Sequence, residues 1–118
     1  MDGEHAMIRI ATVVAVAVTL LGITGPLAAQ AQAGRIEAGR TKAQACAVCH
    51  GPNGQATAPD APNLAGQNPA YTEAALKAYR SGARRHEVMG VMAKPLSDQD
   101  IADLAAWYGA IKVEVNLP

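Results

Sequence analysis

Phenylalanine is absent from this 118-residue chain, and aromatic residues make up only 3% of it, although hydrophobic residues account for 50%. With so few large side chains, a folded core needs another bulky apolar component to fill it. An excess of charge is also lacking, because ten basic residues balance ten acidic ones. This balance argues against a nucleic-acid partner and against a basic membrane-binding surface. The two cysteines stand three positions apart, which excludes disulfides between distant segments.

One long apolar run occurs, close to the N-terminus. No charged residue lies between positions 10 and 34, and the segment from Ile10 to Ile23 is almost entirely apolar. Arg9 precedes this run, and Ala31-Gln32-Ala33 has the small-x-small pattern of a signal-peptidase site. The run is shorter than the ~20 residues that span a bilayer. We therefore predict a signal peptide at residues 1–33 that is cleaved after Ala33, with a retained membrane anchor as the alternative.

The remaining domain, residues 34–118, is predicted to be all-α. Helices are expected at residues 35–47, at 68–81 and from 97 onward, with loops at 51–67 and 82–95 between them. Asn68 and Pro69 form a start signal for the second helix and Gly82 a stop signal, while Ser97 to Asp100 resembles a capping box. The predicted inward faces carry Tyr71, Ala75, Leu76 and Tyr79 on the second helix, and Ile101, Leu104, Tyr108 and Ile111 on the last.

The chemistry-bearing motif is Cys46-Ala47-Val48-Cys49-His50. Cys-x-x-Cys-His is the attachment pattern of c-type haem, in which both thiols add to haem vinyl groups and the histidine ligates the iron. Two sulfurs one helical turn apart reach neighbouring vinyls on one edge of the porphyrin, and the next residue then lies beneath the metal. A covalent haem would also supply the missing bulk of the core.

Paired cysteines also occur in redox dithiols and in zinc sites. A thioredoxin-like dithiol follows a strand in a βαβ pattern, and no strand is predicted before Cys46. A zinc site needs four ligands, and beyond the motif only His86 remains in the predicted mature chain. Both alternatives are therefore weaker than haem.

With these residues in place, the chain resembles a class I cytochrome c and is most similar to one half of a dihaem cytochrome c of the c-four type. The resemblance rests on residues 46–51, on Pro62 to Gln67, on Tyr71, and on Met89 to Tyr108. It implies a small fold of three to four helices around one covalently attached haem. Only one haem motif is present, so the electron exchange between two haem domains is not carried over.

The resemblance also implies the groups that hold the haem. Cys46 and Cys49 would form the covalent bonds, and His50 would be one axial ligand. Met89, which lies seven positions before Leu96, matches the second axial ligand, with Met92 as the first alternative and His86 or an open site as the others. Pro62 matches the proline whose carbonyl accepts a hydrogen bond from the histidine, which would orient the imidazole.

Further positions carry weaker expectations. Tyr71 and Arg80 are candidates for contact with the haem propionates, although each is equally compatible with a core or surface role on its helix. Gly39 and Trp107 match the place where the first and last helices of the family cross. This last role is structural.

Taken together, the sequence predicts a periplasmic, monohaem electron carrier that is not an enzyme. Its expected partners are redox proteins, including a terminal oxidase or a dehydrogenase. The membrane would be a partner only if the N-terminal segment were retained. One alternative is a haem subunit docked on a periplasmic dehydrogenase, and another, from a different class, is a haem sensor or peroxidase with an open iron position.

Overall fold

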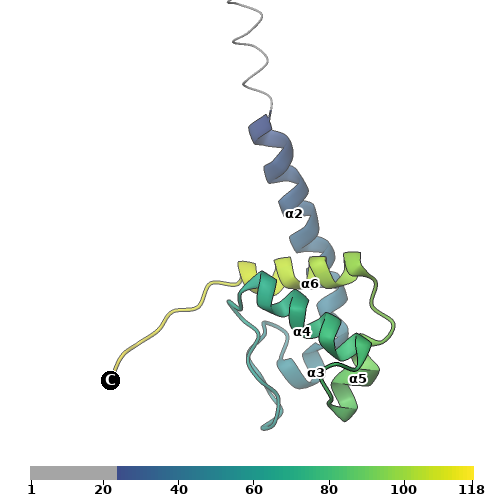
Figure 1. The fold of residues 1–118 in the computed structure, drawn as a ribbon. Helices are drawn as coiled ribbons and strands as arrows, with labels where there is room; N and C mark the ends of the chain where they lie inside the picture. The colour runs from purple at the N-terminus through teal and green to yellow at the C-terminus, as the bar shows by residue number, and fades with distance from the viewer. Residues whose placement is uncertain (1–23) are drawn as a thin grey trace, which may run out of the picture. The chain divides into compact units, whose positions relative to one another are not determined.

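The computed structural model describes residues 24–118 of the chain, so the apolar run from Ile10 to Ile23 lies outside the described part. The elements in order are α2 (Thr24–Lys42), the 3₁₀ turn η1 (Ala43–Ala45), α3 (Ala47–His50), α4 (Pro69–Ser81), α5 (Glu87–Ala93) and α6 (Asp98–Ala110). No strand occurs among these described residues, which confirms the all-α prediction (Figure 1). Within residues 24–118, no helix has both the length and the hydropathy that crossing a bilayer requires. The chain divides into compact units at residues 1–31 and 32–118, and the second holds the haem motif.

The helix predicted at residues 35–47 has different ends in the structure. Helix α2 already begins at Thr24, because the alanine- and glutamine-rich segment before Gly34 favours a helix and Pro26 falls in the first turn, where it removes no helical hydrogen bond. The α-helix ends at Lys42, and the backbone tightens into the 3₁₀ turn before Cys46. The bond after Ala33, where cleavage was predicted, therefore lies within a helix.

The predicted ends of α4 and the start of α6 are confirmed. Asn68 accepts hydrogen bonds from the backbone N–H groups of Ala70 and Tyr71, Pro69 opens α4, and Gly82 ends it in the left-handed conformation. At α6 the Ser97 side chain and the Asp100 side chain each bind the other residue's backbone N–H, which completes the capping box. These short-range contacts need no tertiary partner, so the sequence alone determines them.

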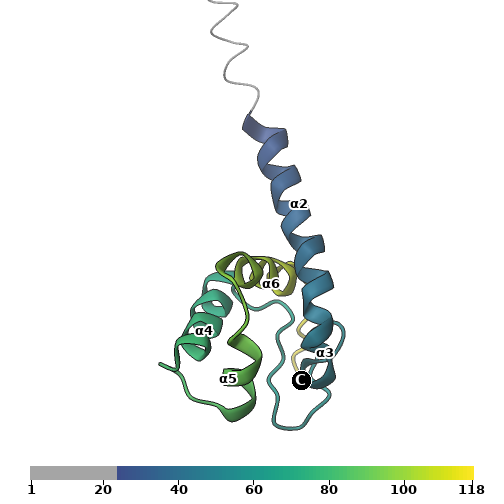
Figure 2. The same ribbon diagram turned by 90° about the vertical axis from the view of Figure 1, so that its right-hand side faces the viewer.

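The core lies along the inner face of α6. Ile101 is fully buried, and Leu104 and Tyr108 are each 2% exposed, as their spacing predicted. Helix α4 packs against both α6 and α5, an arrangement that Figure 2 shows with α6 above the other two. Tyr71, predicted on the inward face of α4, is instead 55% exposed, and the buried position in that turn belongs to Thr72.

The predicted crossing of the first and last helices is confirmed at Gly39. A side chain there would overlap the carbonyl oxygen of Asp103 and would lie 2.8 Å from Cβ of Trp107. On the outer side, the guanidinium of Arg40 lies 5.9 Å from the centre of the Trp107 ring. Only glycine permits the two helix backbones to approach this closely.

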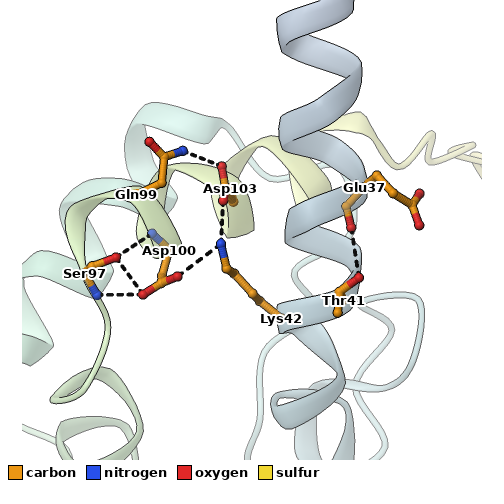
Figure 3. A network of polar contacts seen from close by, with 7 residues as sticks. All are labelled: Glu37, Thr41, Lys42, Ser97, Gln99, Asp100 and Asp103. Carbon is orange, nitrogen blue, oxygen red and sulfur yellow. Dashed lines mark hydrogen bonds and ion pairs between the residues drawn. The ribbon is translucent and has the colours of Figure 1, made fainter.

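An ion-pair network joins the end of α2 to the start of α6 beside this crossing (Figure 3). Lys42 Nζ lies 2.5 Å from Asp103 and 3.1 Å from Asp100, and Gln99 donates to the other oxygen of Asp103. Burial opposes ionisation of Asp103, but the hydrogen bonds from Lys42 and Gln99 outweigh it and leave its pKa below the usual value. The buried carboxylate is thus paired and hydrogen-bonded, as stability requires.

Replacing Gly39 with alanine should separate the two helices. Overpacking against a backbone carbonyl is expected to lower the free energy of unfolding of the haem-loaded protein by about 1–3 kcal/mol, measured by chemical denaturation. The matched control is Gly34→Ala, because no atom lies within 4 Å of a Cβ built at that glycine. Equal unfolding free energies for the two variants would contradict a steric role for Gly39.

The ion-pair network should also make the free energy of unfolding depend on pH. The Ser97 hydroxyl, the Ser97 backbone N–H and Lys42 together lower the pKa of Asp100 to about 2, well below the usual value of an aspartate. Because the folded state binds a proton at Asp100 more weakly than the unfolded state does, the free energy of unfolding decreases as pH falls from about 4 towards 2. Asp100→Asn should flatten the fall in unfolding free energy between pH 4 and pH 2, measured by denaturant titration at each pH; an unchanged slope would contradict the assignment.

Candidate functional site

The two cysteines and the histidine of the motif lie on one turn. The backbone N–H groups of Cys49 and His50 both reach the carbonyl of Cys46, at 3.3 and 3.0 Å, so Cys46 starts the short helix α3. Both thiols are free and half-buried. The structure therefore presents two sulfurs one helical turn apart, with the imidazole immediately after them.

Cys46 packs against the hydrophobic core. Its side chain packs against the buried cluster of Ala43, Leu104 and Tyr108. Burial raises the pKa of the Cys46 thiol, and the nearby Tyr108 hydroxyl partly opposes this shift. The first cysteine of the motif is thus positioned by α6, a helix more than fifty residues later in the chain.

His50 is buried, 7% exposed, and its ring orientation is set by one contact. Nδ1 lies 2.8 Å from the carbonyl oxygen of Pro62. A carbonyl only accepts hydrogen bonds, so Nδ1 carries a proton, and in the neutral imidazole Nε2 is then the unprotonated nitrogen. An imidazole in this tautomer has its free lone pair at Nε2, which is the form that a metal ligand requires.

The loop at residues 51–67 is tied to the motif by its own hydrogen bonds. Gly51 has a φ of 77°, and a side chain there would overlap the carbonyl of Gln55. The backbone N–H of Thr57 donates to Cys49 O at 3.0 Å, and its hydroxyl donates to Val48 O at 3.1 Å. These bonds satisfy carbonyls at the end of α3 and bring the chain back so that Pro62 meets His50.

The structure places Met89 and Met92 on helix α5, which corrects the predicted loop at residues 82–95. The helix forms because His86, in extended conformation, caps it: its Nδ1 accepts from the Met89 backbone N–H at 3.2 Å. Met89 is half-buried and Met92 is 38% exposed. Both views place α5 and α3 at the same end of the domain, below α6 (Figures 1 and 2).

Tyr71 and Arg80, the candidates for contact with the propionates, have hydrogen-bond partners on other parts of the chain. Arg80 donates to the carbonyl of Leu96 at 2.8 Å and to Asp98 at 2.6 Å, so it links α4 to the start of α6. The Tyr71 hydroxyl lies 3.5 Å from the guanidinium of Arg84. For Arg80, the structure provides a role in helix packing that the sequence did not suggest.

The donor set of α3 fits a covalent haem better than a bare metal ion. Two free thiols and one oriented imidazole on a single turn match the three bonds of a c-type haem to its attachment motif. In the part of the chain that the structure describes, no three side chains of His, Cys, Asp or Glu gather as metal ligands. His86, the fourth ligand that a zinc site would need, instead caps α5.

Sequence reasoning missed two residues of this site. The sequence predicts Tyr108 on the inward face of its helix but gives it no role beside Cys46, and it distinguishes Thr57 in no way from the rest of the loop at residues 51–67. The apolar spacing of α6 pointed to the burial of Tyr108, whereas no local signal marked Thr57. Both contacts join segments that are separated in the chain, so neither follows from spacing alone.

Comparison with known proteins agrees with this geometry. Residues 36–109 match the family model for cytochrome c. The chain therefore belongs to the cytochrome c family. Its members carry iron in a covalently bound haem c and transfer electrons rather than catalyse reactions, and both properties extend to this chain.

Individual relatives place the chain more closely. It is 48% identical to cytochrome c-554(548) of Halomonas halodenitrificans over 81 residues, which cover 66% of this chain and 98% of the relative. It is 39% identical to cytochrome c4 of Pseudomonas aeruginosa over 97 residues, covering 82% of this chain and 47% of the relative. The chain thus spans about half the length of the cytochrome c4 relatives, which confirms the likeness to a single c-four domain. The cytochrome subunit of sulfide dehydrogenase of Chlorobaculum tepidum is 34% identical over 87 residues, 73% of this chain and 78% of the relative.

Proposed function

We propose that this chain is a periplasmic carrier of single electrons, with its haem attached at Cys46 and Cys49 and ligated by His50 and Met89. The observation that carries the proposal is the 2.8 Å contact between His50 Nδ1 and Pro62 O, which holds a buried imidazole in the ligating tautomer. An ordinary surface histidine needs no such orientation. The haem supplies reversible one-electron chemistry at its iron.

The protein's part begins with the cysteines. Each thiol would form an S–C bond to one vinyl group, with its hydrogen passing to the other vinyl carbon, so attachment needs no oxidant. Cys46 and Cys49 would thereby hold a large apolar group against α3. The haem would add bulk to a domain whose largest fully buried side chains, among residues 24–118, are Ile101 and Leu104.

His50 and Met89 would be the two protein ligands of the iron. Pro62 O holds the imidazole in one orientation, and His86 starts the helix that carries Met89. A filled, rigid sphere changes little between the ferrous and ferric states, which suits electron transfer. A thioether ligand raises the reduction potential, so we expect a high-potential carrier that feeds an oxidase or a similar acceptor.

A haem subunit of a periplasmic dehydrogenase is the second candidate, and one observation favours it. Apolar side chains are exposed on α3 and α5: Val48 is 83% exposed and Val91 is 71% exposed. Exposed apolar groups beside a redox motif suit a permanent protein interface. Size-exclusion chromatography of the natively purified haem protein distinguishes the two, since a subunit elutes with its enzyme and a carrier elutes alone.

Haem attachment and export are tested together by the intact mass of the secreted protein. We expect a chain that begins at Gly34 and carries the mass of one haem. Cys46→Ala or Cys49→Ala should sharply reduce the yield, and the double variant should carry no haem and be degraded, because the core lacks its filling group. A folded, colourless double variant would contradict the proposal.

The assignment of Met89 as an iron ligand is tested by removing its side chain, which should leave a coordination position free. Met89→Ala should abolish the methionine–iron charge-transfer absorption, lower the reduction potential and allow rapid binding of carbon monoxide or cyanide. Met92→Ala is the matched control from the same helix and should have none of these three effects. Rapid ligand binding by the wild-type protein would indicate a sensor or peroxidase instead, and opening by Met92→Ala alone would move the ligand to that residue.

A further inference from the structure

Two buried hydrogen-bond donors on α6 have no partner among residues 24–118. They are the indole Nε1 of Trp107 and the hydroxyl of Tyr108. Buried polar groups are nearly always paired, because an unpaired donor loses its bonds to water without replacement. Trp107 lies against Gly39 of α2 and also borders the buried cluster of Ala43, Leu104 and Tyr108, whereas Tyr108 is a member of that cluster, against which Cys46 packs.

Tyr108 is held firmly where it lies. The residue is 2% exposed, and its ring packs with Ala43 and Leu104. On another side, ring atom Cδ1 lies 3.1 Å from a Cβ built at Gly54, so only glycine leaves room there. Its backbone carbonyl accepts from the Gly66 N–H at 2.9 Å. Main chain and ring are thus both restrained, and the hydroxyl has little freedom to reach water.

The side chain of Cys46 packs against the buried cluster to which Tyr108 belongs. The Cys46 thiol and the Tyr108 hydroxyl are close enough to influence each other, since the hydroxyl partly lowers the pKa of the thiol that burial raises. In a thioether, this sulfur has no proton and keeps its lone pairs, so it can only accept a hydrogen bond. A phenol without a partner therefore lies beside a group that, once haem is attached, can act only as an acceptor.

We propose that Tyr108 is a positioning residue for the haem, and that its hydroxyl donates a hydrogen bond to the Cys46 sulfur of the thioether. The inference rests on the proposed attachment of haem at Cys46. The bond pairs the buried donor and restricts rotation about the attachment. It also withdraws electron density from the sulfur, which favours the reduced iron, because hydrogen bonds to groups bound to a redox centre tune its potential.

The test uses the complete haem-loaded protein and resonance Raman spectra of the thioether C–S stretch in H₂O and D₂O. We expect a component of this band in the wild type that shifts in D₂O, because the phenol proton exchanges. Tyr108→Phe should lose that shift and should have a lower reduction potential. A wild-type C–S band with no D₂O-sensitive component overturns the proposal, and this measurement needs no variant.

The matched control is Trp107→Phe, which removes the other unpartnered donor from the adjacent position on α6. It is expected to keep the D₂O-sensitive band and the wild-type potential, whatever its effect on stability. If Tyr108→Phe retains both properties, the hydroxyl does not bind the sulfur and the proposal fails. If intact mass shows no haem, it is the proposed function that fails; if haem is attached and the band is insensitive to D₂O, only this inference fails.

Discussion

The contact between Gly39 and the carbonyl of Asp103 brings the backbones of α2 and α6 together with no side chain between them, and the remainder of the domain is arranged around that approach. It places Leu104 and Tyr108 against the turn that leads into the haem motif. Lys42, one residue before that turn, closes the junction by binding Asp103 and Asp100. A steric constraint and a paired buried charge therefore act on the same few residues.

The junction of α2 and α6 restrains one part of the site, and the loop after the motif restrains the rest. Cys46 is held by side chains of α6, whereas Cys49 and His50 are held by backbone groups of the loop that follows them. Because the bond to His50 comes from the Pro62 main chain, its acceptor survives a change of side chain at that position. An electron carrier benefits from such restraint, since its coordination sphere must not rearrange when the iron changes oxidation state.

The relatives contain a domain similar to this chain, but they differ in total length. Cytochrome c-554(548) matches the chain over nearly its own full length, whereas the cytochrome c4 relatives are about twice as long as the region that matches. The same haem domain thus occurs alone and as half of a larger protein.

Local sequence determined the class of the fold, the caps of α4 and α6 and the attachment motif, because each depends on residues only a few positions apart. It failed at α5, where one imidazole nitrogen of His86 starts a helix that composition did not indicate, and at Tyr71, whose predicted inward position is exposed. Only the tertiary structure decided the bond of Asp103 to Lys42, the place of Tyr108 beside Cys46 and the anchoring of α3 by Thr57. Each of these contacts joins segments whose meeting depends on the packing of whole helices and loops, and no periodicity within one segment encodes it.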